Sequence, residues 1–298
     1  MIAQYPEFTR VDLAIKDNYE KIIRKFPSYS DFNFVSLFCW NTDGSAEVSR
    51  LGDGIVIKLK DYTSEKTVYS YMTDSSDAIK YINELFNVTD TLSLVPETTI
   101  KSLSNIDDFI IEEDLDNFDY IYKVDELLKM GGGALKKKRN KVNQFKNDLS
   151  EVVTTKTYKK VTDIQRLEAE GLFAQWCFEN DKFAIDLLDE SSAIFNAIDN
   201  LEQLDLVFIE LRVKDKLKGF SINQKVDSNT AVCHFEKTVR AHVNIGPYLV
   251  NKVAEELDKM GCEYVNWEQD LGIVGLRQAK KSYQNSHHLK KYILKKAS

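Results

Sequence analysis

The sequence predicts an α+β protein made of two tandem domains, each a mixed, mainly antiparallel sheet flanked by helices. The order strand, strand, strand, helix, strand occurs twice, over residues 47–95 and again over residues 206–267. Three glycines at 131–133 lie between the two halves, and 298 residues suit two domains of about 150 better than one. We therefore expect an N-terminal domain at 1–130, a glycine-hinged basic linker helix at 131–150, and a C-terminal domain at 151–298 that carries the site.

The first half begins with a helix and then forms a meander. Residues 17–26 place apolar and basic side chains on opposite sides of a helix, and Pro27 ends it. The aromatic-rich run 29–40 indicates core packing. Strands are expected at 47–51, 55–59 and 67–72, followed by a helix at 76–86 and a strand at 91–95.

The second half repeats this order after two helices. Apolar stripes predict helices at 164–179 and 190–201 that pack on the second sheet. Strands follow at 206–213, 217–226 and 230–236, then a helix at 248–260 and a strand at 263–267. Alternating apolar residues at 288–294 predict a closing strand.

The composition limits the classes of protein to which the chain can belong. The chain is 43% hydrophobic and 29% charged, and it contains no apolar run of the roughly 18 residues that a membrane helix needs. The N-terminus lacks a signal-peptide pattern, so we expect a cytoplasmic protein. The four cysteines are widely spaced in mostly apolar surroundings, which predicts buried, reduced thiols, and no His/Cys spacing predicts a metal site.

Basic residues are segregated in two stretches. Residues 136–147 contain six Lys/Arg and residues 271–298 contain seven, and neither stretch contains an acid, although the chain carries −7 overall. The first stretch predicts a polyphosphate or tRNA contact through Lys137, Lys138, Arg139, Asn140 and Lys141. The alternative is that both stretches are solvated surfaces.

The loop at 237–245 is the strongest candidate for binding an anion. It joins a strand to a helix for which Gly246 and Pro247 suggest the start, so free backbone N–H groups point toward it. We expect Arg240, His242, Asn244 and Gly246 to bind a cofactor here. Helix capping alone would also explain Asn244.

Candidate catalytic and substrate-binding residues flank this loop. Glu236 ends the preceding strand and is the predicted general base, and His234, two residues earlier, could orient it. The alternatives are an edge glutamate paired with Lys237 or Arg240 and a core histidine. A second set is predicted to bind a charged substrate or to form a structural ion-pair network: Glu268, Asp270, Arg277 and Lys280.

Four segments together resemble a known family. They are Phe26-Pro-Ser-Tyr-Ser-Asp-Phe-Asn-Phe, Lys138-Arg-Asn-Lys-Val-Asn-Gln-Phe, His234-Phe-Glu-Lys, and the run that begins Trp267-Glu-Gln-Asp-Leu-Gly and ends at Tyr283. They are similar to stand-alone bacterial relatives of the phosphatidylglycerol lysyltransferase C-terminal domain. The resemblance implies two tandem acetyltransferase-like (GNAT) domains, with cofactor phosphates at the helix after the anion-binding loop. It also implies transfer of an aminoacyl group from aminoacyl-tRNA, in the full-length membrane enzymes to a lipid headgroup.

The sequence thus predicts an acyl- or aminoacyl-transferase. The expected donor is acyl-CoA or aminoacyl-tRNA, and the expected acceptor is an amine or hydroxyl on a small molecule or headgroup. The rival hypothesis is a non-catalytic RNA-binding or regulatory module on the same scaffold.

Overall fold

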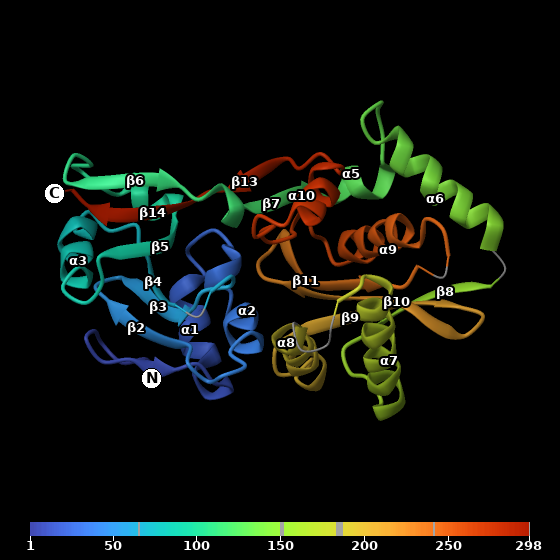
Figure 1. The fold of residues 1–298 in the computed structure, drawn as a ribbon, viewed down its shortest axis with the longest axis horizontal. Helices are drawn as coiled ribbons and strands as arrows, with labels where there is room; N and C mark the ends of the chain where they lie inside the picture. The colour runs from blue at the N-terminus through green and yellow to red at the C-terminus, as the bar shows by residue number, and fades with distance from the viewer. Residues whose placement is uncertain (65, 150–151, 183–186, 241, 298) are drawn as a thin grey trace. The chain divides into compact units, whose positions relative to one another are not determined.

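The computed structural model describes residues 1–64, 66–149, 152–182, 187–240 and 242–297, and the chain forms two compact units (Figure 1). Unit 1 comprises residues 1–120, 269–277 and 288–298, and unit 2 comprises residues 121–268 and 278–287. The chain therefore leaves unit 1, builds unit 2, and returns twice to unit 1 near its end.

Unit 1 contains two antiparallel sheets. Their strand orders are β1-β2-β3-β4 and β5-β14-β6, so the last strand of the chain lies between two strands from its first half. The strands are β1 (Thr9–Arg10), β2 (Glu47–Leu51), β3 (Gly54–Lys60), β4 (Thr67–Met72), β5 (Thr91–Pro96), β6 (Phe109–Glu113) and β14 (Lys291–Lys296).

The helices of unit 1 are short, and the local sequence determines where they form. Asn33 caps one of them, because its Oδ1 accepts a hydrogen bond of 2.7 Å from the backbone N–H of Val35. The aromatic run predicted to pack is buried, with Phe32 and Phe34 each 1% exposed. The helices are α1 (Lys16–Ile23), α2 (Phe34–Cys39), α3 (Ala78–Leu85) and α4 (Glu97–Lys101), with 3-10 turns at Leu13–Ile15, Ser30–Phe32 and Leu115–Asn117.

A buried polar cluster fixes the last strand in unit 1. Lys291 at the start of β14 forms ion pairs with Asp31 and Asp119, and all three side chains are fully buried. Ser30 Oγ donates to Asp119 Oδ1 at 2.6 Å and accepts from Lys291 Nζ at 2.9 Å. Because a buried ion without its partners is costly, this cluster holds three distant segments in one arrangement.

Unit 2 is organised on one mixed sheet. Its strand order is β13-β7-β12-β11-β10-β9-β8, and β11 and β12 run parallel while the neighbouring pairs β7–β12, β10–β11, β9–β10 and β8–β9 are antiparallel. The strands are β7 (Asp119–Lys123), β8 (Val153–Tyr158), β9 (Leu206–Val213), β10 (Lys216–Lys225), β11 (Thr230–Thr238), β12 (Tyr264–Asn266) and β13 (His287–Leu289).

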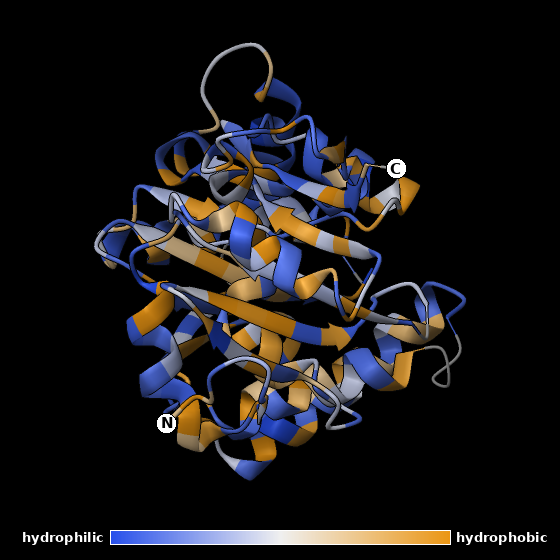
Figure 2. Cartoon of the chain, turned by 90° about the vertical axis from the view of Figure 1, so that its left-hand side faces the viewer, coloured by the Kyte–Doolittle hydropathy of each residue, from blue (hydrophilic) through white to orange (hydrophobic). Residues whose placement is uncertain are grey.

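Helices of unit 2 bury apolar faces against this sheet. The helix α9 (Ile245–Lys259) packs on β10 and β11 and buries Leu249, Val253 and Leu257, while α7 (Asp163–Glu179) packs on the same two strands. The remaining helices are α5 (Val124–Lys129), α6 (Lys136–Leu149), α8 (Leu188–Asp199) and α10 (Val274–Lys281). In Figure 2 apolar residues run along the strands, and the helices alternate apolar and hydrophilic residues.

Most of the predicted elements are present, with boundaries within a few residues. The predicted strand at 288–294 is divided into β13 and β14, and four strands were not predicted: β1, β6, β7 and β8. Their sequences are rich in charged or Thr residues, as in the run Val153–Tyr158, so their apolar period is weak and partner strands fix them. Gly246 and Pro247 suggested the start of α9, but the helix begins one residue earlier, at Ile245, and Asn244 is the cap residue with a left-handed φ of 68°. All four cysteines are free and buried, as predicted.

Candidate functional site

The sheet of unit 2 opens between its two parallel strands. β11 and β12 pair only from Thr230 with Tyr264 to Val232 with Asn266, and β11 then continues to Thr238 without this neighbour. The backbone groups that face each other beyond Val232 are therefore released from the ladder. An opening of this kind in the middle of a sheet leaves backbone N–H and C=O groups that a ligand can contact.

Glu236 lies on β11 beyond this opening, directly opposite Ser221 of β10. The residue is partly exposed, but its Oε2 atom is buried and accepts no hydrogen bond from the described residues. Burial raises the pKa of this carboxyl to about 7, although the charge of Lys237 opposes the shift. A carboxyl that ionises near neutral pH, with one buried oxygen unpaired among the described residues, has the properties of a general base.

The charge of Glu236 affects the pKa values of two neighbouring side chains. Burial and then the Glu236 charge raise the pKa of the Tyr283 hydroxyl, so it stays protonated at neutral pH. The same two causes raise the pKa of the Cys233 thiol, whose Sγ lies 3.4 Å from Ser221 Oγ. A protonated, buried thiol is not an activated nucleophile. Tyr283 was not singled out from the sequence, although it closes the segment from Trp267 that carried the resemblance.

His234 contacts a different carboxylate from the one expected. Its Nδ1 lies 3.0 Å from Glu268 Oε1. The β10–β11 register passes from Ile222–Phe235 to Asn223–Cys233, so His234 is the extra residue of a β-bulge. The bulge breaks the alternation on which the predicted pairing of His234 with Glu236 depended.

The loop before α9 gathers the four residues predicted to bind a cofactor. Arg240, His242, Asn244 and Gly246 line one cavity of about 300 Å³, together with Lys141 from α6. Asn244 does not cap α9 through its side chain; instead its Nδ2 donates to Gln144 Oε1 at 3.1 Å. Ala241 in this loop lies outside the described residues. The cavity has basic and amide groups beside a helix N-terminus, which suits an anion.

The four residues predicted to bind substrate fall into two units. Glu268 and Lys280 belong to unit 2, where Lys280 Nζ donates to the backbone oxygens of Trp267 and Glu268. Asp270 and Arg277 belong to unit 1, where they form a bidentate pair that also includes Tyr120 and the N–H of Gly272. Burial raises the pKa of Asp270, but these hydrogen bonds outweigh it and the pKa is below its ordinary value.

The basic helix presents only part of its predicted surface. Lys137, Asn140 and Lys141 are exposed. Arg139 instead donates to the backbone oxygen of Met130 at 2.9 Å. Lys138 Nζ lies 3.8 Å from the ring centre of Tyr283, and burial beside Lys141 lowers its pKa to about 8. Lys138 therefore belongs to the surroundings of Tyr283 rather than to the open surface.

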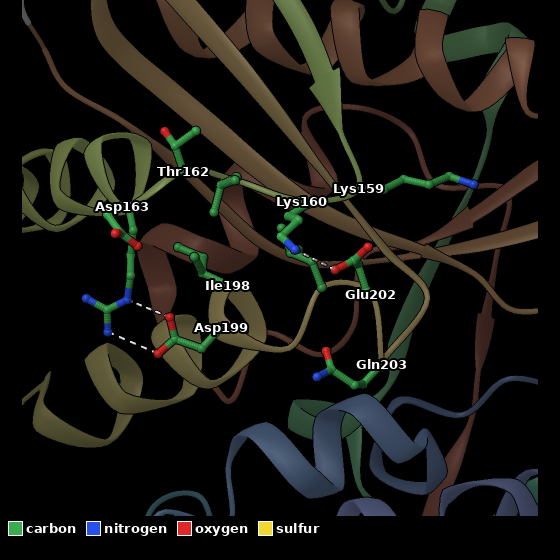
Figure 3. Close-up of a pocket in the computed structure, with 11 residues that line it drawn as sticks. Lys159, Lys160, Thr162, Asp163, Ile198, Asp199, Glu202 and Gln203 are labelled. Carbon is green, nitrogen blue, oxygen red and sulfur yellow. Dashed lines mark hydrogen bonds and ion pairs between the residues drawn. The ribbon is translucent and has the colours of Figure 1, made fainter.

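A second cavity, of about 280 Å³, lies beside the start of α7 (Figure 3). Its charged groups are largely paired with one another: Arg166 Nη2 donates to Asp199 Oδ2 at 3.0 Å, and Lys160 Nζ lies 3.4 Å from Glu202. Thr162 and Gln165 form a capping box at the start of α7, in which the backbone N–H of each residue donates to the side chain of the other. The polar groups of this cavity are therefore largely paired with one another, and few remain to bind an anion.

The described residues contain no group of three His, Cys, Asp or Glu side chains that could hold a metal ion. Among the same residues, no helix is both long and apolar enough to cross a membrane.

The fold is an α+β architecture of two tandem acetyltransferase-like (GNAT) domains with mixed, mainly antiparallel sheets. A family model described as "Phosphatidylglycerol lysyltransferase, C-terminal" matches residues 23–295. The chain belongs to this family, whose name describes an enzyme that transfers a lysyl group to phosphatidylglycerol.

Solved structures show the same fold. A conserved protein of unknown function from Bacteroides thetaiotaomicron is 26% identical, with a TM-score of 0.83 and complete coverage of both chains. L-PGS from Bacillus licheniformis is 11% identical, with a TM-score of 0.66 over 99% of this chain and 94% of that one. FemX is 10% identical, with a TM-score of 0.61 over 98% of this chain and 97% of that one. No curated protein sequence matches the chain.

Proposed function

We propose that this protein is an aminoacyl- or acyltransferase that moves a group from aminoacyl-tRNA or acyl-CoA to an amine or hydroxyl acceptor. The observation that carries the proposal is the Glu236 carboxyl, which has a pKa of about 7 and a buried oxygen without a partner among the described residues. Membership of a family named for lysyl transfer supports the aminoacyl donor over the acyl-CoA donor.

The proposed chemistry is general base catalysis at the sheet opening. Ionised Glu236 takes a proton from the acceptor ammonium or hydroxyl, and the freed lone pair attacks the carbonyl carbon of the donor. The bond from that carbon to the donor oxygen or sulfur then breaks, and the departing atom takes up a proton. The protonated Tyr283 hydroxyl is a group in this neighbourhood that can donate a hydrogen bond to the developing negative charge.

The loop cavity is the proposed site for donor phosphates. Arg240, His242 and Lys141 line it, and no acid is among its described lining residues, although Glu179 accepts a hydrogen bond from the backbone N–H of Arg240. The corresponding loop of unit 1, between β4 and α3, instead contains Asp74 and Asp77. An acidic loop repels phosphate, so the charges favour unit 2 as the donor-binding unit.

The test separates donor binding from transfer. Melting temperature is recorded with charged tRNA, uncharged tRNA, acetyl-CoA and CoA, for the wild type and for Glu236→Gln. We expect charged tRNA to stabilise both proteins, and only the wild type to transfer the aminoacyl group to hydroxylamine or a lipid headgroup. Stabilisation by CoA species alone would identify acyl-CoA as donor, and unchanged transfer by Glu236→Gln would exclude Glu236 as the base.

The rival function, a non-catalytic RNA-binding module, is favoured by the exposed Lys137 and Lys141 on α6. It predicts salt-sensitive RNA binding without turnover of any charged tRNA.

A further inference from the structure

The helix α7 is apolar on two opposite faces. Its inner face buries Leu172, Phe173 and Cys177 against the sheet of unit 2. Its outer face carries Ile164, Leu167 and Phe178, whose exposed fractions are 71%, 61% and 84%. Large apolar side chains are exposed singly on many proteins, but a row of them along one helix marks an interaction surface.

The outer residues follow the spacing of a helix-packing seam. Ile164, Leu167, Gly171, Ala174 and Phe178 succeed one another at intervals of three and four residues, and all five are exposed. At 100° per residue they fall within roughly 80° of arc, opposite the inner face. We call these five residues the outer stripe.

Packing among the described residues does not explain Gly171 at the centre of the outer stripe. It lies inside a helix of 17 residues, where glycine is less favourable than alanine. A Cβ atom built at this position would meet nothing within 4 Å, so packing within the chain does not require a glycine. Glycine on an open helix face permits the close approach of another backbone.

We propose that the outer stripe is the interface of a homodimer in which two copies of α7 pack antiparallel about a twofold axis at Gly171. The outer stripe is self-complementary about that residue. Ile164 and Phe178 lie seven residues on either side of Gly171, so Ile164 of each copy faces Phe178 of the other. Leu167 lies four residues before Gly171 and Ala174 three residues after it, so Leu167 of each copy comes close to the small Ala174 of the other, and glycine faces glycine. A surface that matches itself in this way is what a twofold interface requires.

The charges around the outer stripe favour a second copy of the chain as its partner. The acids beside it are already neutralised within the chain, because Glu168 pairs with Arg212 and Glu170 with Arg166. Counted over the flanking residues, the two ends of the helix carry opposite formal net charge, although Lys160 at the N-terminal end is itself paired with Glu202. Lys159, Lys160 and Asp163 lie at the N-terminal end, and Glu179, Asp181 and Lys182 lie at the C-terminal end.

An antiparallel pair brings these opposite ends together and also opposes the two helix dipoles. A parallel pair would place like ends side by side. A single pair of helices is a small interface, so we expect association at concentrations of about 10 to 100 μM.

The first experiment is sedimentation velocity over a concentration series. We expect the weight-average sedimentation coefficient of the wild type to rise with concentration, and Leu167→Glu to weaken association at least about tenfold. The matched control is Val88→Glu, which changes a side chain that is 54% exposed in unit 1 and should associate like the wild type. A wild type that stays monomeric throughout, or equal association of Leu167→Glu and wild type, overturns the proposal.

Gly171→Ala and pairs of cysteine variants test the antiparallel packing of the two α7 helices at Gly171. Gly171→Ala should raise the melting temperature of the dilute monomer and yet weaken the dimer, because the methyl groups separate the backbones. An equimolar mixture of Ile164→Cys and Phe178→Cys should form mixed disulfides on mild oxidation, and the four native cysteines are buried and do not compete. Disulfides between identical variants instead of mixed ones would overturn the antiparallel arrangement.

Discussion

His234 Nδ1 lies 3.0 Å from Glu268 Oε1, just past the point at which the parallel strands β11 and β12 part. The contact connects β11, which contains the bulge, to the segment that follows β12. It lies at the opening of the sheet of unit 2, on the same strand as Glu236.

A double-mutant cycle on His234 and Glu268 measures the coupling free energy of this contact. We expect His234→Ala and Glu268→Ala each to destabilise the protein, and the double variant to be less destabilised than their sum by about 1 kcal/mol, because the second change removes an interaction already lost. The measurement is urea unfolding followed by circular dichroism. Additive free energies would show that the contact contributes no coupling.

Glu236 predicts a pH dependence of stability. Its pKa is about 7 in the folded chain against an ordinary value of 4.5, so between these pH values the unfolded chain loses this proton while the folded chain keeps it. The free energy of unfolding should therefore fall as pH rises through this window, by on the order of 2 kcal/mol from this group. Glu236→Gln should remove that fall, and urea unfolding between pH 4.5 and 8 compares the two proteins. An equal slope in both would contradict the assignment.

The same carboxyl predicts a pH dependence of activity. A general base must be ionised, so the single-turnover rate of transfer should rise with pH and reach half of its maximum near pH 7. The measurement uses an acceptor that does not titrate between pH 5.5 and 8.5, which removes the acceptor as a source of the profile. A rate that is flat across this range would show that Glu236 is not the base.

Lys291 predicts a large loss of stability on truncation. Lys291→Met leaves Asp31 and Asp119 buried without their cation, and we expect a loss of about 3 to 5 kcal/mol. The neighbouring Lys290 is the matched control: its side chain is 41% exposed in a pair with Glu113, so Lys290→Met should cost under about 1 kcal/mol. Similar losses in the two variants would show that burial of the cluster adds nothing.

The exposed face of α6 predicts a salt-dependent contact. Lys137→Gln and Lys141→Gln should each reduce the slope of log affinity against log salt for tRNA by about 0.7 to 0.9. Lys138→Gln should change it less, because Lys138 lies against the Tyr283 ring. Filter binding between 50 and 300 mM salt gives the slopes. An unchanged slope in the Lys137 and Lys141 variants would exclude this face as the phosphate contact.

The sequence predicted the parts of this protein that depend on local periodicity. Apolar alternation identified β9, β10 and β11, and helical spacing identified α7 and α9, because each pattern reflects which residues face a core. The same patterns placed Glu236 at the end of a strand and Arg240 in the loop before a helix. Those positions follow from order along the chain alone.

Only the tertiary structure decided which side chains meet. The bulge at His234 turned its contact toward Glu268, and a fold in the chain placed Lys138 against Tyr283, which lies 145 residues further along the sequence. The closing strand β14 joined the sheet of unit 1 through Lys291. Local periodicity determines which face of an element is apolar, whereas packing between distant segments determines its partners, and no local pattern encodes those partners.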